Sequence, residues 1–263
     1  MVDSQCGKSY TVEDLREIVA LLRSEQGCPW DREQTHESIR RNFLEEAYEV
    51  CEAIDAKDAK LLREELGDVL LQVIFHTQIE TERGAFTLDD VADVTCKKLI
   101  FRHPHIFGDA TAKDSSEVMI AWDELKRREK RHETTAQSME AVAKSLPATW
   151  RAEKIQEKAA SVGFDWPSAQ GAMDKLEEEL GELKQAIQSK QGIAEELGDL
   201  FFSLVNVARL LDLDPEEVLH GASHKFIRRF SYLEEAAGIR GQALGDMPLA
   251  EMEALYQEGK EQL

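Results

Sequence analysis

The chain has 263 residues, of which 42% are hydrophobic and 32% are charged. This length suits one large domain or two ordinary ones, and the apolar fraction is sufficient for packed cores, which excludes an intrinsically disordered protein. Acidic residues outnumber basic residues 52 to 32 and give a formal net charge of -20, which argues against nucleic acid or an anionic membrane as a partner.

The N-terminal segment and the cysteines predict a soluble, cytoplasmic protein. The first 18 residues are polar and acidic and lack the apolar core of a signal peptide. No apolar run approaches the roughly 20 residues that span a bilayer. The four cysteines form no CxxC pair, so a disulfide scaffold or a zinc site is not expected.

Apolar residues recur at intervals of three and four along most of the chain, which is typical of amphipathic helices. Short polar segments, Asp55–Lys60 and Ser189–Gly192, separate two pairs of such stretches and suit tight links between antiparallel helices. No segment alternates apolar and polar residues as a strand would, so the chain is predicted to be all-α. In chain order, helices are expected over about 12–24, 43–54, 62–73, 88–99, 116–131, 148–161, 176–187, 193–207, 215–237 and 249–261.

The second half of the chain repeats the first. Five segments recur in the same order at separations between 127 and 136 residues, which is typical of a duplicated unit. We therefore predict two tandem helical-bundle units, 1–134 and 135–263, with the seam in a polar stretch that ends at Pro147. The matched segments are Gly27–Trp30 with Gly163–Trp166, Glu45–Glu49 with Glu178–Glu182, Glu65–Asp68 with Glu196–Asp199, Lys98–Arg102 with Lys225–Arg229, and Trp122–Lys126 with Tyr256–Lys260.

Each unit carries the motif EExxE on one helix and ExxD on the next. Residues three apart share a helix face, so packing the two helices together brings four carboxylates to one point. Each exposed like-charge pair costs roughly 0.2–0.5 kcal/mol, and a hard divalent cation removes this repulsion. Oxygen-only ligands indicate Mg²⁺, with Mn²⁺ as a substitute. The predicted ligands are Glu46, Glu49, Glu65 and Asp68 in the first unit and Glu179, Glu182, Glu196 and Asp199 in the second.

An isolated EExxE motif is usually a solvated helix surface, and two observations favour the metal site here. The complete set of acids occurs twice, and both ExxD motifs read ELGD, which places Gly67 and Gly198 within helices. A glycine in the middle of a helix costs about 0.8–1 kcal/mol relative to alanine. Its recurrence therefore suggests the close approach of a neighbouring helix or a ligand.

Basic and aromatic residues would complete a phosphate site. Two cations four residues apart share a helix face in each unit, although surface salt bridges explain them equally well. The aromatic residue that follows each pair could stack on a base, but a single aromatic on a helix is more often part of a core. Lys175, one turn before Glu179, could reach a phosphate, and the first unit has Asn42 there. The other candidates are Lys98, Arg102, Trp122, Lys225, Arg229 and Tyr256.

With these residues identified, the chain resembles the MazG family of nucleoside triphosphate pyrophosphohydrolases, in its long two-domain form. The likeness covers nearly the whole length and rests on segments such as GCPWD, LEEAYEV, EELGD, FRHPHIFGD, VGFDW, EELGDLFFSLVNVAR and KFIRRF. The resemblance implies a fold similar to that of all-helical dimeric dUTPases. It also implies Mg²⁺-dependent hydrolysis of NTPs and dNTPs to the monophosphate and pyrophosphate by a homodimer that acts in nucleotide-pool housekeeping.

By position, the resemblance implies that the second-unit acids bind the metal and that the C-terminal unit is the principal catalytic one. The first unit keeps every acid, so the working unit stays open. Glu178 or Glu45 is expected to accept a proton from the attacking water or to orient it. A narrower dUTPase, a modified-nucleotide hydrolase and a non-enzymatic helical adaptor are the alternatives. The implied nucleotide contacts are Lys175, Lys225, Arg229 and Tyr256, with Lys98, Arg102, Trp122 and Lys126 as their first-unit equivalents.

Overall fold

The structure, a computed structural model, describes residues 9–111, 114, 117, 118, 122, 125 and 134–262. It divides the chain into two compact units, Met1–Lys126 and Arg127–Leu263. Helices account for all regular structure in these described ranges, and no strand occurs among them, which confirms the all-α prediction. The boundary predicted between residues 134 and 135 stays a prediction.

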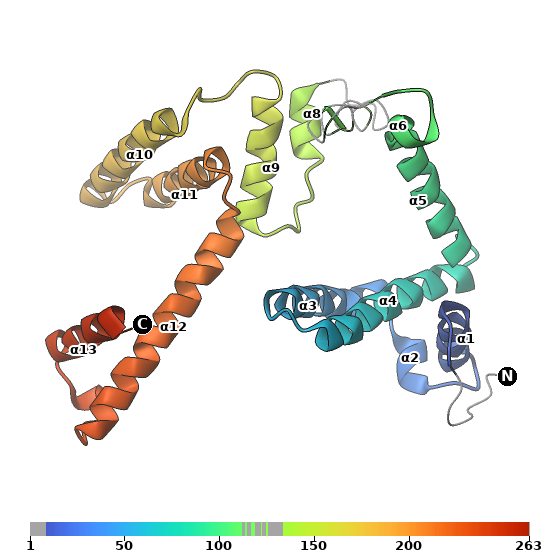
Figure 1. Cartoon of the computed structure of the whole chain (residues 1–263), viewed down its shortest axis with the longest axis horizontal. Coiled ribbons are helices and arrows are strands. Elements are labelled where there is room, and N and C mark those ends of the chain that lie inside the picture. The colour runs from blue at the N-terminus through green and yellow to red at the C-terminus, as the bar shows by residue number, and fades with distance from the viewer. Residues whose placement is uncertain are drawn as a thin grey trace. The chain divides into compact units, whose positions relative to one another are not determined.

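The first unit is built around an antiparallel helical hairpin (Figure 1). Helices α3 and α4 form this hairpin, α1 packs against α4, and α5 continues the chain from the end of α4. Their apolar faces meet in a core of Val19, Ile39, Ile74, Phe75 and Ile79. The helices are α1 (Val12–Arg23), α2 (Pro29–Glu33), α3 (His36–Asp55), α4 (Ala59–Glu82), α5 (Leu88–Arg102) and α6 (Pro104–Phe107).

Local sequence signals fix where the helices of this hairpin begin and end. Thr35 caps α3 by accepting a hydrogen bond from the backbone N–H of Ser38, whose side chain accepts one in return from Thr35. Lys57, between α3 and α4, has a left-handed backbone with φ of 54°. Asp58 then accepts hydrogen bonds from the N–H groups of Lys60 and Leu61 and starts α4. The predicted tight link is therefore present, and both helices extend beyond their predicted ends.

Arg23, at the end of α1, joins three elements of the first unit. Its guanidinium donates hydrogen bonds to both carboxylate oxygens of Glu82 on α4, each at 2.9 Å. It also donates to the backbone carbonyls of Asp31 at 2.6 Å and Gln34 at 3.1 Å, at the end of α2. The Arg23 side chain is only 5% exposed. This buried cation therefore holds the α1–α2 corner against α4.

The second unit contains a matching hairpin, α10–α11, against which α9 packs (Figure 1). Lys190 and Gly192, with φ of 59° and 70°, make the reversal between its two helices. Further along the chain, α12 and α13 pack together around Leu233, Ala237 and Leu255. The helices are α8 (Thr135–Glu140), α9 (Ala148–Ala160), α10 (Ala169–Ser189), α11 (Ile193–Leu210), α12 (Pro215–Ile239) and α13 (Leu249–Gln262), with a 3₁₀ turn at Leu244–Asp246.

Three short helices, α2, α6 and α8, were not predicted from the sequence. Pro104 begins α6, where its fixed φ suits the first helical position. Most of the helix predicted over 116–131 lies outside the described residues. Within the part of the chain that is described, none of the helices is both long and apolar enough to cross a bilayer.

Candidate functional site

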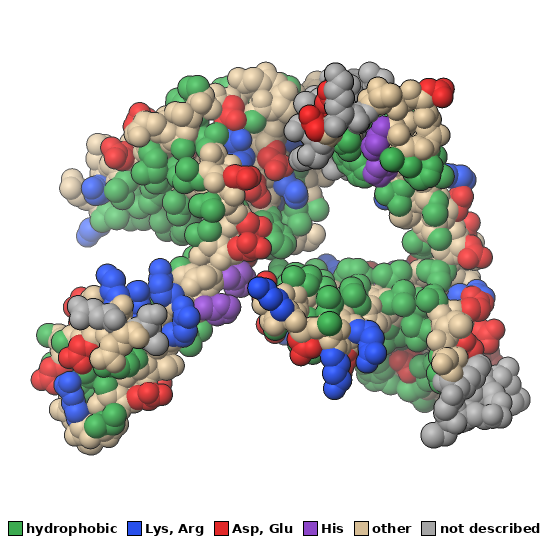
Figure 2. Space-filling model, in the orientation of Figure 1, with side chains coloured by type: hydrophobic (Ala, Val, Ile, Leu, Met, Phe, Trp, Pro, Cys, Tyr) green, Lys and Arg blue, Asp and Glu red, His purple; other side chains and the backbone are tan. Residues whose placement is uncertain are grey.

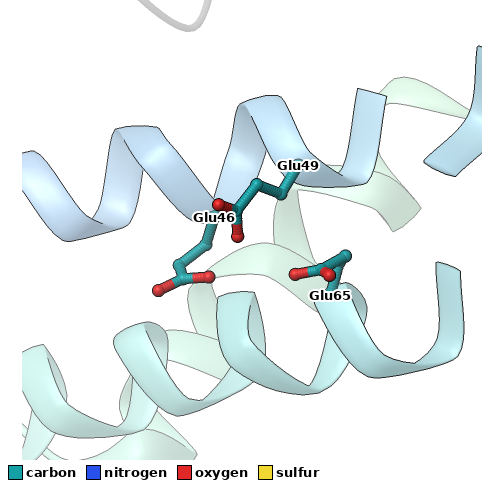
Figure 3. Close-up of side chains that lie close together, drawn as sticks. All are labelled: Glu46, Glu49 and Glu65. Atoms are coloured by element: carbon teal, nitrogen blue, oxygen red, sulfur yellow. The ribbon is translucent and has the colours of Figure 1, made fainter. Parts of the chain in front are cut away.

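Three predicted metal ligands of the first unit converge across the α3–α4 hairpin. Glu46 and Glu49 project from α3 toward Glu65 on α4 (Figure 3). One carboxylate oxygen from each residue lies within 4.8 Å of the other two. Glu46 and Glu65 are half-buried, whereas Glu49 is exposed. The cluster is therefore open to solvent on one side, as a site for an ion and a ligand requires.

The electrostatics of this cluster show that its acids repel one another. Burial raises the pKa of Glu46, and the charges of Asp68, Glu49 and Glu65 raise it further. The pKa of Glu65 is also raised, first by burial and then by Glu49 and Asp68. Asp68, the fourth predicted ligand, therefore lies next to the three converging oxygens without being one of them. Such mutual shifts are common where acids share a functional site.

The second unit has a similar cluster, but its three converging acids occupy partly different positions in the two motifs. Oxygens of Glu179 on α10 and of Glu196 and Asp199 on α11 lie within 4.8 Å of one another. Glu179 is buried, with 6% of its surface exposed. Glu182, the fourth predicted ligand, is exposed and lies beside this set. Partial desolvation and then the charges of Glu179 and Glu196 raise its pKa. Each hairpin thus gathers three predicted ligands and keeps the fourth nearby.

Lys175 pairs with acids in this structure. Its ammonium lies 2.7 Å from Glu179 Oε1 and 3.0 Å from Glu178 Oε1. Hydrogen bonds to Glu179 and then to Glu178 raise the pKa of Lys175 above its ordinary value. The predicted proton acceptor of the first unit, Glu45, accepts a hydrogen bond from Arg41 at 2.7 Å. Both predicted proton acceptors, Glu178 and Glu45, therefore have a basic partner.

The predicted basic and aromatic residues meet within each unit. The Arg102 guanidinium lies 5.4 Å from the centre of the Trp122 ring, and that of Arg229 lies 5.9 Å from the Tyr256 ring. Both distances fit a cation–π contact. Lys98 is half-buried on α5 and Lys225 is exposed on α12, one turn before these arginines. Lys126 lies outside the described residues.

In the second unit, the structure does not bring the predicted basic residues of α12 to the acids of α10 and α11. In the second unit α12 contacts α9 and, where the two helices join, α11, while its far half packs on α13. That far half carries Arg229 and runs away from the α10–α11 hairpin (Figure 1). Within the described ranges, no ion pair links Lys225 or Arg229 to Glu179, Glu196 or Asp199. In the second unit, the residues predicted to bind phosphate are therefore separate from the predicted metal ligands within a single chain.

The two mid-helix glycines face open space. A Cβ atom built on Gly67 or on Gly198 meets nothing within 4 Å among the described residues. The expected close approach by a neighbouring helix of the same chain is therefore wrong. Approach by a ligand or by a second copy of the chain stays a prediction.

This prediction can be tested with Gly198→Ala. In the isolated chain we expect the substitution to stabilise α11 by up to about 1 kcal/mol, because alanine favours helix and the added methyl group meets no atom. If a ligand or a second copy approaches closely, nucleotide binding or self-association should weaken. Calorimetry and sedimentation measure the two effects, and Gly67→Ala is the matched change in α4. Increased stability with unchanged binding and association would contradict the close approach.

Comparison with known proteins places the chain in a family. The model of the MazG nucleotide pyrophosphohydrolase domain matches residues 34–107 and 168–233, which contain the two acid-bearing hairpins. The nucleoside triphosphate pyrophosphohydrolase/pyrophosphatase MazG of Thermotoga maritima is 44% identical over 94% of this chain and 95% of its own length. The nucleoside triphosphate pyrophosphohydrolase of Escherichia coli K12 is 41% identical over 95% and 97%. The chain belongs to the MazG family and carries its domain twice.

Proposed function

We propose that the protein is a nucleoside triphosphate pyrophosphohydrolase that converts NTPs and dNTPs to the monophosphate and pyrophosphate. The observation that carries the proposal is the convergence of three carboxylates from two paired helices, which occurs once in each unit. The relatives from Thermotoga maritima and Escherichia coli, which match over nearly their whole length, are named for this activity. We infer a cytoplasmic role in nucleotide-pool housekeeping.

The residues of both clusters fit a hard divalent cation. All converging donors are carboxylate oxygens, which Mg²⁺ and Mn²⁺ prefer, and no histidine or cysteine among the described residues joins either set. The raised pKa values of Glu46 and Glu65 reflect burial and a repulsion that a cation would relieve. When bound, Mg²⁺ supplies the positive charge that neutralises a triphosphate and acidifies a water molecule. The acids that would hold it are Glu46, Glu49, Glu65 and Asp68, or Glu179, Glu182, Glu196 and Asp199.

The remaining residues act on the nucleotide and the water. Water attacks the α-phosphorus, the bond to the bridging oxygen of pyrophosphate breaks, and Glu178 or Glu45 accepts the proton that the water loses. Lys225 and Arg229, or Lys98 and Arg102, share the charge that develops on the phosphates. Tyr256 or Trp122 stacks on the base. Because stacking does not distinguish bases, we expect broad substrate use.

We further propose that the protein works as a homodimer. Hydrophobic side chains cover much of the visible surface of α10 and α11 (Figure 2). A second copy would bury these side chains and bring basic residues of α12 to acids that they do not reach within one chain. The exposed apolar residues include Leu180, Ile187, Leu197, Phe201 and Leu204.

The experiment measures the products formed from individual NTPs, dNTPs, dUTP, and oxidised and methylated nucleotides. We expect pyrophosphate as the first product, only with Mg²⁺ or Mn²⁺, and none after chelation by EDTA. Orthophosphate as the first product would contradict the proposal. A kcat/KM much higher for dUTP, or for a modified nucleotide, than for the other substrates would support a dUTPase or a modified-nucleotide hydrolase instead. An absence of Mg²⁺-dependent nucleotide binding in a thermal-shift assay would favour a helical adaptor. Light scattering gives the oligomeric state.

A further inference from the structure

The two acid clusters differ in one residue at a matching place. Lys175 on α10 precedes Glu179 by four residues, and Asn42 on α3 precedes Glu46 by the same interval. Residues four apart lie on the same helix face, one turn from each other. The second cluster therefore has a cation within reach of its most buried acid, and the first has a neutral amide there.

The contacts of Lys175 differ from those of an ordinary surface pair. Its ammonium lies 2.7 Å from Glu179 Oε1, and the Glu179 side chain is only 8% exposed. Glu179 also supplies one of the three converging oxygens of the second cluster. A metal ion held by this cluster would therefore share the Glu179 carboxylate with the ammonium, and the two positive charges would repel each other.

In the part of the chain that the structure describes, the first cluster has no such basic neighbour. Among the described residues, no lysine or arginine forms an ion pair with Glu46, Glu49 or Glu65, and the nearby Arg41 pairs with Glu45 instead. Burial and then repulsion raise the pKa of Glu46 and Glu65, and among the described residues no ion pair supplies a counter-charge to either acid. A divalent cation would relieve this repulsion, whereas in the second unit Lys175 already relieves part of it.

We propose that Lys175 makes metal binding in the second unit depend on nucleotide. Without nucleotide, Lys175 acts as a built-in counter-ion of Glu179 and weakens metal binding. The phosphates of a nucleotide are a stronger partner for its ammonium, so nucleotide draws Lys175 away and leaves Glu179 to the metal. The first unit, with Asn42, binds a divalent cation alone. This inference rests on the proposed function, because it takes the acid clusters as metal sites.

The test titrates the full-length protein with Mn²⁺ alone and follows free Mn²⁺ by electron paramagnetic resonance. For the unmodified protein we expect one strong Mn²⁺ site per chain, which is lost in Glu65→Gln. A second site should appear when a triphosphate analogue with a methylene group between the α- and β-phosphorus is added, relative to a blank with the analogue and no protein. Activity is not needed for either measurement.

Two matched variants place the residue of one unit in the other, at positions 175 and 42. In a Glu65→Gln background, Lys175→Asn should strengthen Mn²⁺ binding to the second unit without nucleotide by at least about tenfold, equivalent to about 1.4 kcal/mol. In an otherwise unmodified chain, Asn42→Lys should weaken binding to the first unit by a similar factor. Circular dichroism checks that each variant is folded.

The outcomes separate this inference from the proposed function. Unchanged or weaker Mn²⁺ binding in folded Lys175→Asn would overturn the role of Lys175, while leaving the metal sites in place. Equal Mn²⁺ binding to both units of the unmodified protein, measured without nucleotide, would also overturn the role of Lys175. A failure of every variant to bind Mn²⁺, with or without the analogue, would overturn the proposed function itself.

Discussion

Glu196→Gln should lower kcat/KM for pyrophosphate release by a factor on the order of 10³, comparable to the loss of a key electrostatic group in an active site. Glu196 lies on α11 with one carboxylate oxygen among the three that converge in the second unit. Glutamine keeps the size of the side chain and removes its charge, so the cluster loses affinity for a cation without losing volume. A coupled assay for pyrophosphate measures the effect.

Glu65→Gln is the matched change, because Glu65 holds the corresponding place on α4 and is half-buried, as Glu196 is. If the second unit carries the activity, as the family resemblance implies, Glu65→Gln should retain most of it. Loss of activity in Glu65→Gln alone would move the working site to the first unit. Full activity in both variants, with helix content unchanged by circular dichroism, would contradict a catalytic role for either cluster.

Arg23→Met should destabilise the first unit by about 3 kcal/mol, at the lower end of the range for breaking a buried ion pair. The lower end applies because the side chain of Glu82 is 36% exposed, whereas that of Arg23 is 5% exposed. Methionine can fill the apolar part of the space beside Phe75. It cannot donate to Glu82 or to the carbonyls of Asp31 and Gln34, which lose the hydrogen bonds that Arg23 donates. Urea unfolding followed by circular dichroism gives the change in free energy.

Arg41→Met provides the control for this experiment. Arg41 forms an exposed ion pair with Glu45 one turn away, and its side chain is 86% exposed. Exposed pairs of this kind contribute little to stability, so we expect no measurable change in the unfolding midpoint. Equal stability of the Arg23 and Arg41 variants would show that the α1–α2 corner does not depend on the buried cation.

Sequence reasoning succeeded where the information is local. The long helices follow from apolar residues at intervals of three and four, and the polar segment Asp55–Lys60 indicated the antiparallel turn between α3 and α4. Once two helices are antiparallel neighbours, acids three residues apart on each must face the same space. The convergence of Glu46 and Glu49 with Glu65 could therefore be predicted from the sequence. The short helices α2, α6 and α8 were not predicted, because four to six residues are too few to show the helical repeat of apolar positions.

Other features depend on contacts between residues far apart in the chain. The partners of Arg23 include Glu82, 59 residues away, and no spacing rule connects the two. Lys175 could bind a phosphate or a carboxylate by its chemistry alone, and its pairing with Glu179 became visible only with both side chains in place. The direction in which α12 leaves α11 separates Arg229 from the acids of α10 and α11. Helical periodicity describes which face of a helix is apolar, whereas the angle between helices depends on how all the side chains pack at their contact.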